Sequence, residues 1–218
     1  MVEVSITPLK CTECGAELTG LDQDVIFFCH NCLRALEFDD KRFKPATVLQ
    51  LPKPEGIGTT SLLWLPMWVF KVTAKASTPP GCANQVNRIL AAHPWVWVMA
   101  FRGFRSSYFG DPGLLYTSRA IEPNLSPPEQ GCMPLGCSIG ESEAKEYIAP
   151  FLLSLVDRSV DVAAIEVFPD ISESRLVSVP FIDEDDKIKD TIIDYKWPII
   201  FIEDIVPLRA ALKRNGMT

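Results

Sequence analysis

Four cysteines near the start of the chain have the types and spacing that favour metal chemistry. Cys11 and Cys14 form one Cys-x-x-Cys pair, and Cys29 and Cys32 form a second pair after 14 intervening residues. Zn²⁺ prefers four ligands at the corners of a tetrahedron and binds thiolates at about 2.3 Å. Two Cys-x-x-Cys turns that face each other supply such a shell. The spacing therefore predicts a structural zinc site of the four-thiolate ribbon type.

Other cysteine chemistries fit this pattern less well. A dithiol redox centre needs only one Cys-x-x-Cys pair, usually at the start of a helix. Rubredoxin-like iron also takes four thiolates, but Leu33 rather than glycine follows the second pair. The sequence shows no secretory signal, so we expect a cytoplasmic protein, in which structural disulfides are rare. His30 lies inside the second pair, and we expect it to be a bystander because four thiolates complete the shell.

A zinc ion held by four protein ligands has no open position for water or substrate. We therefore expect it to fold the ribbon and not to catalyse a reaction. Ribbons of this kind commonly bind nucleic acid or protein. The acidic residues that we expect on the ribbon surface are Glu13, Glu17, Asp22, Asp24, Glu37, Asp39 and Asp40. Their charge favours a protein partner over nucleic acid.

The elements expected to position the cysteines are short strands and turns. Residues 25–29 and 33–38 are predicted strands on either side of the second turn. Gly15 follows the first pair, where the turn often requires a positive φ. A proline-rich stretch at 45–56 marks the expected boundary between a zinc ribbon, residues 1–45, and a second domain, residues 46–218.

The second domain is expected to be β-rich, mixed but mainly antiparallel, with two or three helices, which makes the fold class α+β. A helix is predicted to begin near Ser142 and to kink or split at Pro150. The long region 105–136 is rich in Gly, Pro and Ser, and is predicted to be irregular. The other predicted elements are strands at 62–76 and 95–104, helices at 83–92 and 205–218, a hairpin formed by 162–169 and 175–183 around 170–174, and a strand at 191–204 bent at Pro198.

The ribbon cysteines and the segment from Trp64 to Phe70, WLPMWVF, carry a resemblance to a known group. The chain resembles bacterial proteins of unknown function that have an N-terminal four-cysteine ribbon and then a strand of the form aromatic-x-Pro-Phe-Trp-x-Phe. Some of these are labelled primosomal or helicase-like. Met67 stands here in place of the Phe, and the four cysteines match one for one. The resemblance implies a zinc-binding scaffold that is not a helicase.

No pattern in the sequence indicates a catalytic residue. The chain has no nucleotide-binding Gly-x-x-x-x-Gly-Lys-Ser/Thr loop, no Gly-x-Ser-x-Gly elbow and no His-Glu-x-x-His. The remaining cysteines, Cys82, Cys132 and Cys137, are expected to be idle thiols, and the alternative for Cys132 and Cys137 is a thiol pair or part of a second metal site. Four tryptophans on predicted strands are candidates for a ligand-binding or exposed surface, although core packing is the commoner role for such residues: Trp64, Trp68, Trp95 and Trp97.

The sequence thus favours a non-enzymatic adaptor or scaffold with a structural zinc ion and a protein partner. One alternative is single-stranded nucleic-acid binding through the ribbon, exposed aromatics and the arginines Arg88, Arg102, Arg105 and Arg119. The other is small-molecule binding by the loop at 105–137. The net charge of −7 and the lack of a basic run disfavour a general duplex binder. No apolar stretch is long enough for a transmembrane segment.

Overall fold

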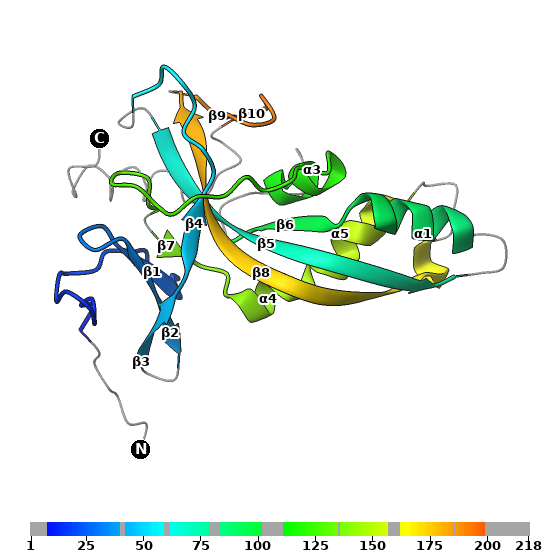
Figure 1. Ribbon diagram of the computed structural model, residues 1–218, viewed down its shortest axis with the longest axis horizontal. Coiled ribbons are helices and arrows are strands. Elements are labelled where there is room, and N and C mark those ends of the chain that lie inside the picture. The colour runs from blue at the N-terminus through cyan, green and yellow to red at the C-terminus, as the bar shows by residue number, and fades with distance from the viewer. Residues whose placement is uncertain are drawn as a thin grey trace.

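The computed structural model describes residues 8–39, 42–58, 62–78, 83–101, 111–134, 136–156, 162–184 and 186–198 of the 218-residue chain. Two β-sheets organise these residues, and helices cover parts of the larger sheet (Figure 1). Most strand pairs are antiparallel, so the predicted α+β class is confirmed. The two strands expected around the second cysteine pair and the helix expected at 83–92 are confirmed as well.

The smaller sheet belongs mainly to the N-terminal ribbon. Its strands are β1 (Ile26–Cys29), β2 (Arg34–Asp39), β3 (Arg42–Ala46) and β7 (Gly136–Cys137), in the spatial order β3-β2-β1-β7. All neighbours are antiparallel. Because β7 comes from more than 100 residues further along the chain, the ribbon sheet is completed by the second part of the molecule.

The larger sheet is built around two long strands. It has the order β10-β9-β8-β5-β6, and β4 (Val48–Gln50) adds to β8 in parallel. Strands β5 and β8 pair along almost their whole lengths, with a register shift between Lys71 and Val72. The bounds are β5 (Leu62–Ser77), β6 (Trp95–Met99), β8 (Glu166–Asp183), β9 (Lys187–Asp190) and β10 (Lys196–Pro198).

The predicted hairpin at 162–183 is wrong, because a single strand, β8, runs from Glu166 to Asp183. The polar run 170–174 suggests a turn by composition, yet it continues the alternation of a half-exposed strand. Asp170, Ser172 and Ser174 face solvent, whereas Ile171 is half-buried and packs on the core. Pairing with β5 supplies hydrogen bonds that keep these polar residues extended.

Four α-helices accompany the sheets among the described residues: α1 (Ala83–Ala92), α3 (Pro112–Ser118), α4 (Glu141–Glu146) and α5 (Ile148–Ser154); a short 3₁₀ helix, η2 (Val162–Ala164), precedes β8. The described part of the predicted irregular region, from residue 111 on, thus contains the helix α3, which Asp111 caps by accepting a hydrogen bond from the Leu114 N–H at 3.2 Å. The predicted break near Pro150 is confirmed, since α4 and α5 meet at Tyr147. The strand predicted at 95–104 is shorter, because β6 ends at Met99. The end of the strand predicted at 191–204 and the helix predicted at 205–218 lie outside the described residues.

The larger sheet is buried on both faces over much of β5. Trp68, Phe70 and Val72 share one face, as the alternation predicts, and pack with α1, α4, α5 and the ribbon. Met67 and Val69 point to the opposite face, toward α3. Side chains that alternate in this way along a strand form two cores, one on each side of the sheet. The first of these cores connects the ribbon to the body, which is the described part of the chain from residue 46 on.

Candidate metal centre

The first Cys-x-x-Cys turn lies at the tip of a small hairpin. Lys10 pairs with Glu17, and the Cys11 N–H donates to the Ala16 carbonyl at 2.8 Å. Gly15 follows the second cysteine of this pair with φ +73°, and its N–H donates to the Cys11 carbonyl at 2.9 Å. The predicted positive φ of Gly15 is therefore confirmed. The turn directs both cysteine side chains to one side of the hairpin.

The second turn connects β1 to β2 and repeats this geometry. Leu33 follows Cys32 with φ +57°, and its N–H donates to the Cys29 carbonyl at 2.8 Å. A residue with a Cβ atom pays about 1–2 kcal/mol in this left-handed conformation. The absence of glycine at this position therefore does not prevent the turn from forming.

The four cysteine sulfurs gather between the two turns. Each Sγ atom lies within 4.8 Å of the others, and the shortest separations are 3.6 Å for Cys11–Cys32 and 3.5 Å for Cys14–Cys29. A tetrahedral zinc site with bonds of about 2.3 Å has sulfurs about 3.8 Å apart, whereas a disulfide is about 2.05 Å long. The four thiols are free, and their arrangement fits a tetrahedral metal ion.

The pKa values of these thiols also favour the binding of a cation. The Asn31 side chain and then the Ala16 backbone lower the pKa of Cys14 to about 6, because they stabilise its thiolate. Burial and then the neighbouring thiol of Cys11 raise the pKa of Cys32 to about 12. Thiolates this close repel one another, so the cluster does not ionise fully by itself. A divalent cation removes this repulsion and releases the protons.

A small apolar cluster packs around the four-cysteine group. Cys11 and Cys29 are buried, whereas Cys14 is exposed. The rings of Phe27 and Phe43 meet edge to face, with centroids 5.7 Å apart. The whole cluster consists of Cys11, Leu18, Phe27, Cys29 and Leu36, with Ala16, Cys32 and Phe43 at its margin. Such a core is too small to fold a ribbon alone, which is the usual reason for a structural metal.

The ribbon is attached to the body through β1 and β2. Residues Ile26, Phe28 and Ala35 belong to the same buried cluster as Trp68 of β5. In Figure 1 the ribbon strands lie at the lower left, near β7 and β4. On the outer edge of β1, Ile26 pairs with Cys137 of β7. The four-cysteine cluster therefore lies at the end of a sheet that packs directly on the body.

The expected acidic surface of the ribbon is only partly exposed. Glu13, Glu17 and Asp22 are exposed, whereas Asp24 and Glu37 are half-buried, which corrects the expectation for these two residues. Asp24 accepts a hydrogen bond from the Leu21 N–H at 2.6 Å. The side chains of Asp39 and Asp40 lie outside the described residues. Among the described ribbon residues, the first cysteine turn thus carries the exposed acidic residues Glu13 and Glu17, and the exposed Lys10 pairs with Glu17 across its hairpin.

The candidate tryptophans are placed mainly in the cores. Trp64, Trp68 and Trp97 are 4%, 6% and 0% exposed, and Trp95 is half-buried. The Trp68 indole N–H donates to the Ile139 carbonyl at 2.9 Å, and that of Trp97 to the Ile121 carbonyl at 2.9 Å. These rings contribute packing and fixed hydrogen bonds. The structure does not bring the four together into one surface.

Among the described residues, the other cysteines and the two histidines do not belong to the four-cysteine cluster. Cys132 and Cys137 are buried, and burial raises the pKa of both thiols. Cys82 lies outside the described residues. His93 makes a 2.9 Å hydrogen bond with the Thr117 carbonyl, and burial lowers the pKa of His30 beside the cluster. Neither histidine belongs to the group of candidate metal ligands.

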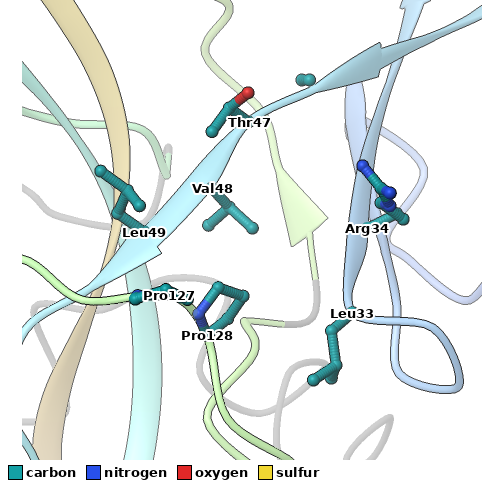
Figure 2. Close-up of a pocket in the computed structure, with 8 residues that line it drawn as sticks. Leu33, Arg34, Thr47, Val48, Leu49, Pro127 and Pro128 are labelled. Carbon is teal, nitrogen blue, oxygen red and sulfur yellow. The ribbon is translucent and has the colours of Figure 1, made fainter.

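A pocket that the sequence did not indicate lies at the junction of the ribbon and the body. Its volume is about 310 Å³. Leu33 and Arg34 line it on the ribbon side, residues 46–49 cross it, and Pro127 and Pro128 close it from the loop at 105–137 (Figure 2). Two neighbouring segments of the N-terminal part and one segment about 80 residues further along form this pocket, so no local motif identifies it.

Comparisons with protein-family models, with curated proteins and with solved structures find no match for this chain. Within the described residues, none of the helices has the length and apolar character needed to cross a membrane. The geometry of the four-cysteine cluster and of the junction pocket therefore carries the functional argument.

Proposed function

We propose that this protein is a non-enzymatic zinc-ribbon adaptor or scaffold that binds a protein partner. The observation that supports the proposal is the closed cluster of four cysteine sulfurs, in which four ligands complete the preferred shell of Zn²⁺. A site of this kind organises a surface and leaves no position for substrate. The bacterial ribbon proteins that the sequence resembles suggest the same scaffolding role.

The partner surface that we propose is the exposed tip of the first cysteine turn. Glu13 and Glu17 are exposed there, beside the exposed Cys14. The metal fixes the backbone of this turn, so its acidic side chains are presented in one geometry. A partner with a basic patch complements this charge. Free thiolates that hold a metal suit a reducing compartment, and on this ground we place the protein in the cytoplasm.

Single-stranded nucleic-acid binding is the less favoured alternative. It requires exposed aromatic rings on which bases stack, together with free cationic side chains. Trp64, Trp68 and Trp97 are buried, and the guanidinium of Arg119 donates to the Ile193 carbonyl at 2.8 Å. Arg88 is exposed on α1, and Arg102 and Arg105 lie outside the described residues. Binding of labelled oligonucleotides that weakens with salt would support this alternative.

The adaptor proposal is tested by affinity capture from the native host with a charge-reversal variant. The zinc-loaded protein is compared with Glu13→Lys/Glu17→Lys and with the control Glu166→Lys/Asp170→Lys, which changes exposed residues of β8. We expect one or more specific proteins to be retained by the wild type and the control and lost from the first variant. Equal retention by all three, or no specific protein with any of them, would contradict the proposed surface.

A further inference from the structure

The junction pocket combines apolar walls with one cationic side chain. Leu33, Val48 and Pro128 supply apolar surface, and Arg34 supplies a guanidinium (Figure 2). No carboxylate lines the pocket among the described residues, and no ion pair joins Arg34 to a described acidic residue. The chain as a whole carries a net charge of −7. A cation beside apolar walls favours a ligand that has both an apolar group and an anionic group.

Strand register places Arg34 next to the crossing strand. Ala35 of β2 pairs with Ala46 of β3, so the next residues, Arg34 and Thr47, lie beside each other at the end of this ladder. Val48 follows directly and begins β4. Arg34 therefore lies at the point where the chain passes from the ribbon sheet to the larger sheet. An anion bound there lies close to the backbone of β4.

The backbone of β4 also has hydrogen-bonding groups on the pocket side. The Leu51 N–H donates to the Ser178 carbonyl of β8. The backbone N–H and C=O groups of alternate residues, including Leu49, therefore point toward β8. Gln50 faces the other way, where its N–H and carbonyl bond to Ser126 at 2.9 and 3.0 Å. The backbone N–H and C=O groups of Val48 point to the same side as those of Gln50, because the direction of these groups alternates from one residue to the next along a strand.

The partner segment cannot continue this ladder. The antiparallel bridge between Gln50 and Ser126 is isolated, and Pro127 and Pro128, which follow Ser126, line the pocket together with Val48 (Figure 2). Proline has no N–H, and neither Pro127 nor Pro128 can donate to the Val48 carbonyl. The pairing between β4 and the segment after Ser126 therefore ends at the pocket, and the Val48 carbonyl points toward the pocket. An extended chain end fits this space better than a compact ion, because it can supply the missing donor.

We propose that the junction pocket binds the free C-terminus of a partner polypeptide whose last residue is apolar. The terminal carboxylate pairs with the Arg34 guanidinium, and the last side chain lies among Leu33, Val48 and Pro128. The N–H of the last residue donates to the Val48 carbonyl. The pocket volume of about 310 Å³ suits one or two residues. This inference rests on the proposed adaptor function and assigns it a second contact, separate from the acidic turn.

The test uses fluorescein-labelled pentapeptides with four alanines and a last residue of Val, Leu, Ile or Phe, measured by fluorescence polarisation on the zinc-loaded protein. We expect saturable binding of at least one free-acid peptide, and binding about tenfold weaker for the matched C-terminal amide. Arg34→Gln is expected to weaken binding by a similar factor. The control Arg88→Gln, an exposed arginine of α1, is expected to leave it unchanged.

Equal binding of acid and amide, or no binding of any free-acid peptide at millimolar concentration, would overturn the proposal. This comparison needs only the wild-type protein, so it stands even if Arg34→Gln folds poorly. N-acetyl-leucine serves as a single-residue competitor. Competition at the same concentration as the best peptide would assign the pocket to small carboxylates and overturn the polypeptide assignment. If host partners are still captured by Arg34→Gln while peptides fail, the adaptor function survives without this pocket.

Discussion

Gly15 and Leu33 occupy equivalent positions in the two cysteine turns. Each follows the second cysteine of its pair, has a positive φ of 73° or 57°, and donates its N–H to the carbonyl of the first cysteine. The ribbon is therefore symmetric in backbone geometry although its sequence is not. The symmetry explains how four sulfurs separated in sequence come within 4.8 Å of one another.

Gly15→Ala is expected to destabilise the zinc-loaded protein by about 1 kcal/mol, because an alanine is strained at a positive φ. A Cβ atom at this position meets nothing within 4 Å, so backbone strain is the whole effect. Gly56→Ala is a matched control, with φ +75° and equally open surroundings. Denaturant unfolding should show similar losses for both variants, and zinc affinity should fall only for Gly15→Ala. Unchanged zinc affinity in Gly15→Ala would contradict this role of the turn.

Gly136→Ala is expected to weaken the contact between β7 and the ribbon. A Cβ atom there would overlap the carboxylate of Asp24, so that this side chain, which accepts from the Leu21 N–H, or the backbone of β7 must shift. We expect a loss of about 1–3 kcal/mol in unfolding free energy. Asp24→Ala removes the obstructing carboxylate, and the double variant should therefore lose less than the sum of the two single variants. Strict additivity in this double-mutant cycle would show that the two residues do not interfere.

Removing the metal with a chelator under reducing conditions is expected to loosen the body as well as the ribbon. Ile26 and Phe28 of the ribbon share a buried cluster with Trp68 of β5 and Ile148 of α5. When the ribbon unfolds, these body residues lose apolar contacts and their amides open more often. Hydrogen exchange followed by mass spectrometry should show faster exchange in β5 near Trp68. Faster exchange confined to residues 8–46 would contradict the shared core.

Tyr116→Phe is expected to lower stability, and more so at pH 7 than at pH 5. Asp190 is buried, and its carboxylate accepts from the Tyr116 hydroxyl at 2.8 Å and from the N–H groups of Ile192 and Ile193. Burial raises the pKa of Asp190. The native state thus holds this proton to higher pH than the unfolded chain, so stability from this group is lost as pH rises through the raised pKa.

Loss of the tyrosine hydroxyl removes a donor to the carboxylate and raises the pKa of Asp190 further. At pH 7 we expect a loss of about 1–3 kcal/mol in unfolding free energy, with a smaller loss at pH 5, where protonation relieves part of the cost. Tyr147→Phe alters a ring that is 40% exposed and should change stability little at either pH. An equal loss for Tyr116→Phe at both values would show that Asp190 is not the group responsible.

Local patterns were sufficient to predict the cysteine turns and several strands. The Cys-x-x-Cys spacing, Gly15 and the flanking apolar residues lie within one short segment, so their geometry depends on near neighbours. The helix α3 also had a local signal, since Asp111 before Pro112 is a typical cap and first residue. That signal was missed because the surrounding Gly and Pro residues dominate the composition of the region.

Features that depend on pairing between distant segments could not be predicted. Strand β8 is continuous because β5 pairs with its polar half, and the composition of 170–174 by itself suggests a turn. The pairing of Ile26 with Cys137 and the pocket around Arg34 likewise join segments about 100 residues apart. No local period or motif encodes such contacts, because they result from the packing of complete sheets.

Metal content is the most direct test of the central claim. The protein is purified with a thiol reductant and without chelators, and its zinc and iron are measured by elemental analysis and native mass spectrometry, with Cys14→Ser and Cys132→Ser as the matched pair. The account predicts one zinc ion per chain in the wild type and in Cys132→Ser, and a marked loss in Cys14→Ser. A protein that holds no zinc, or whose four ribbon cysteines are joined as disulfides, would contradict it.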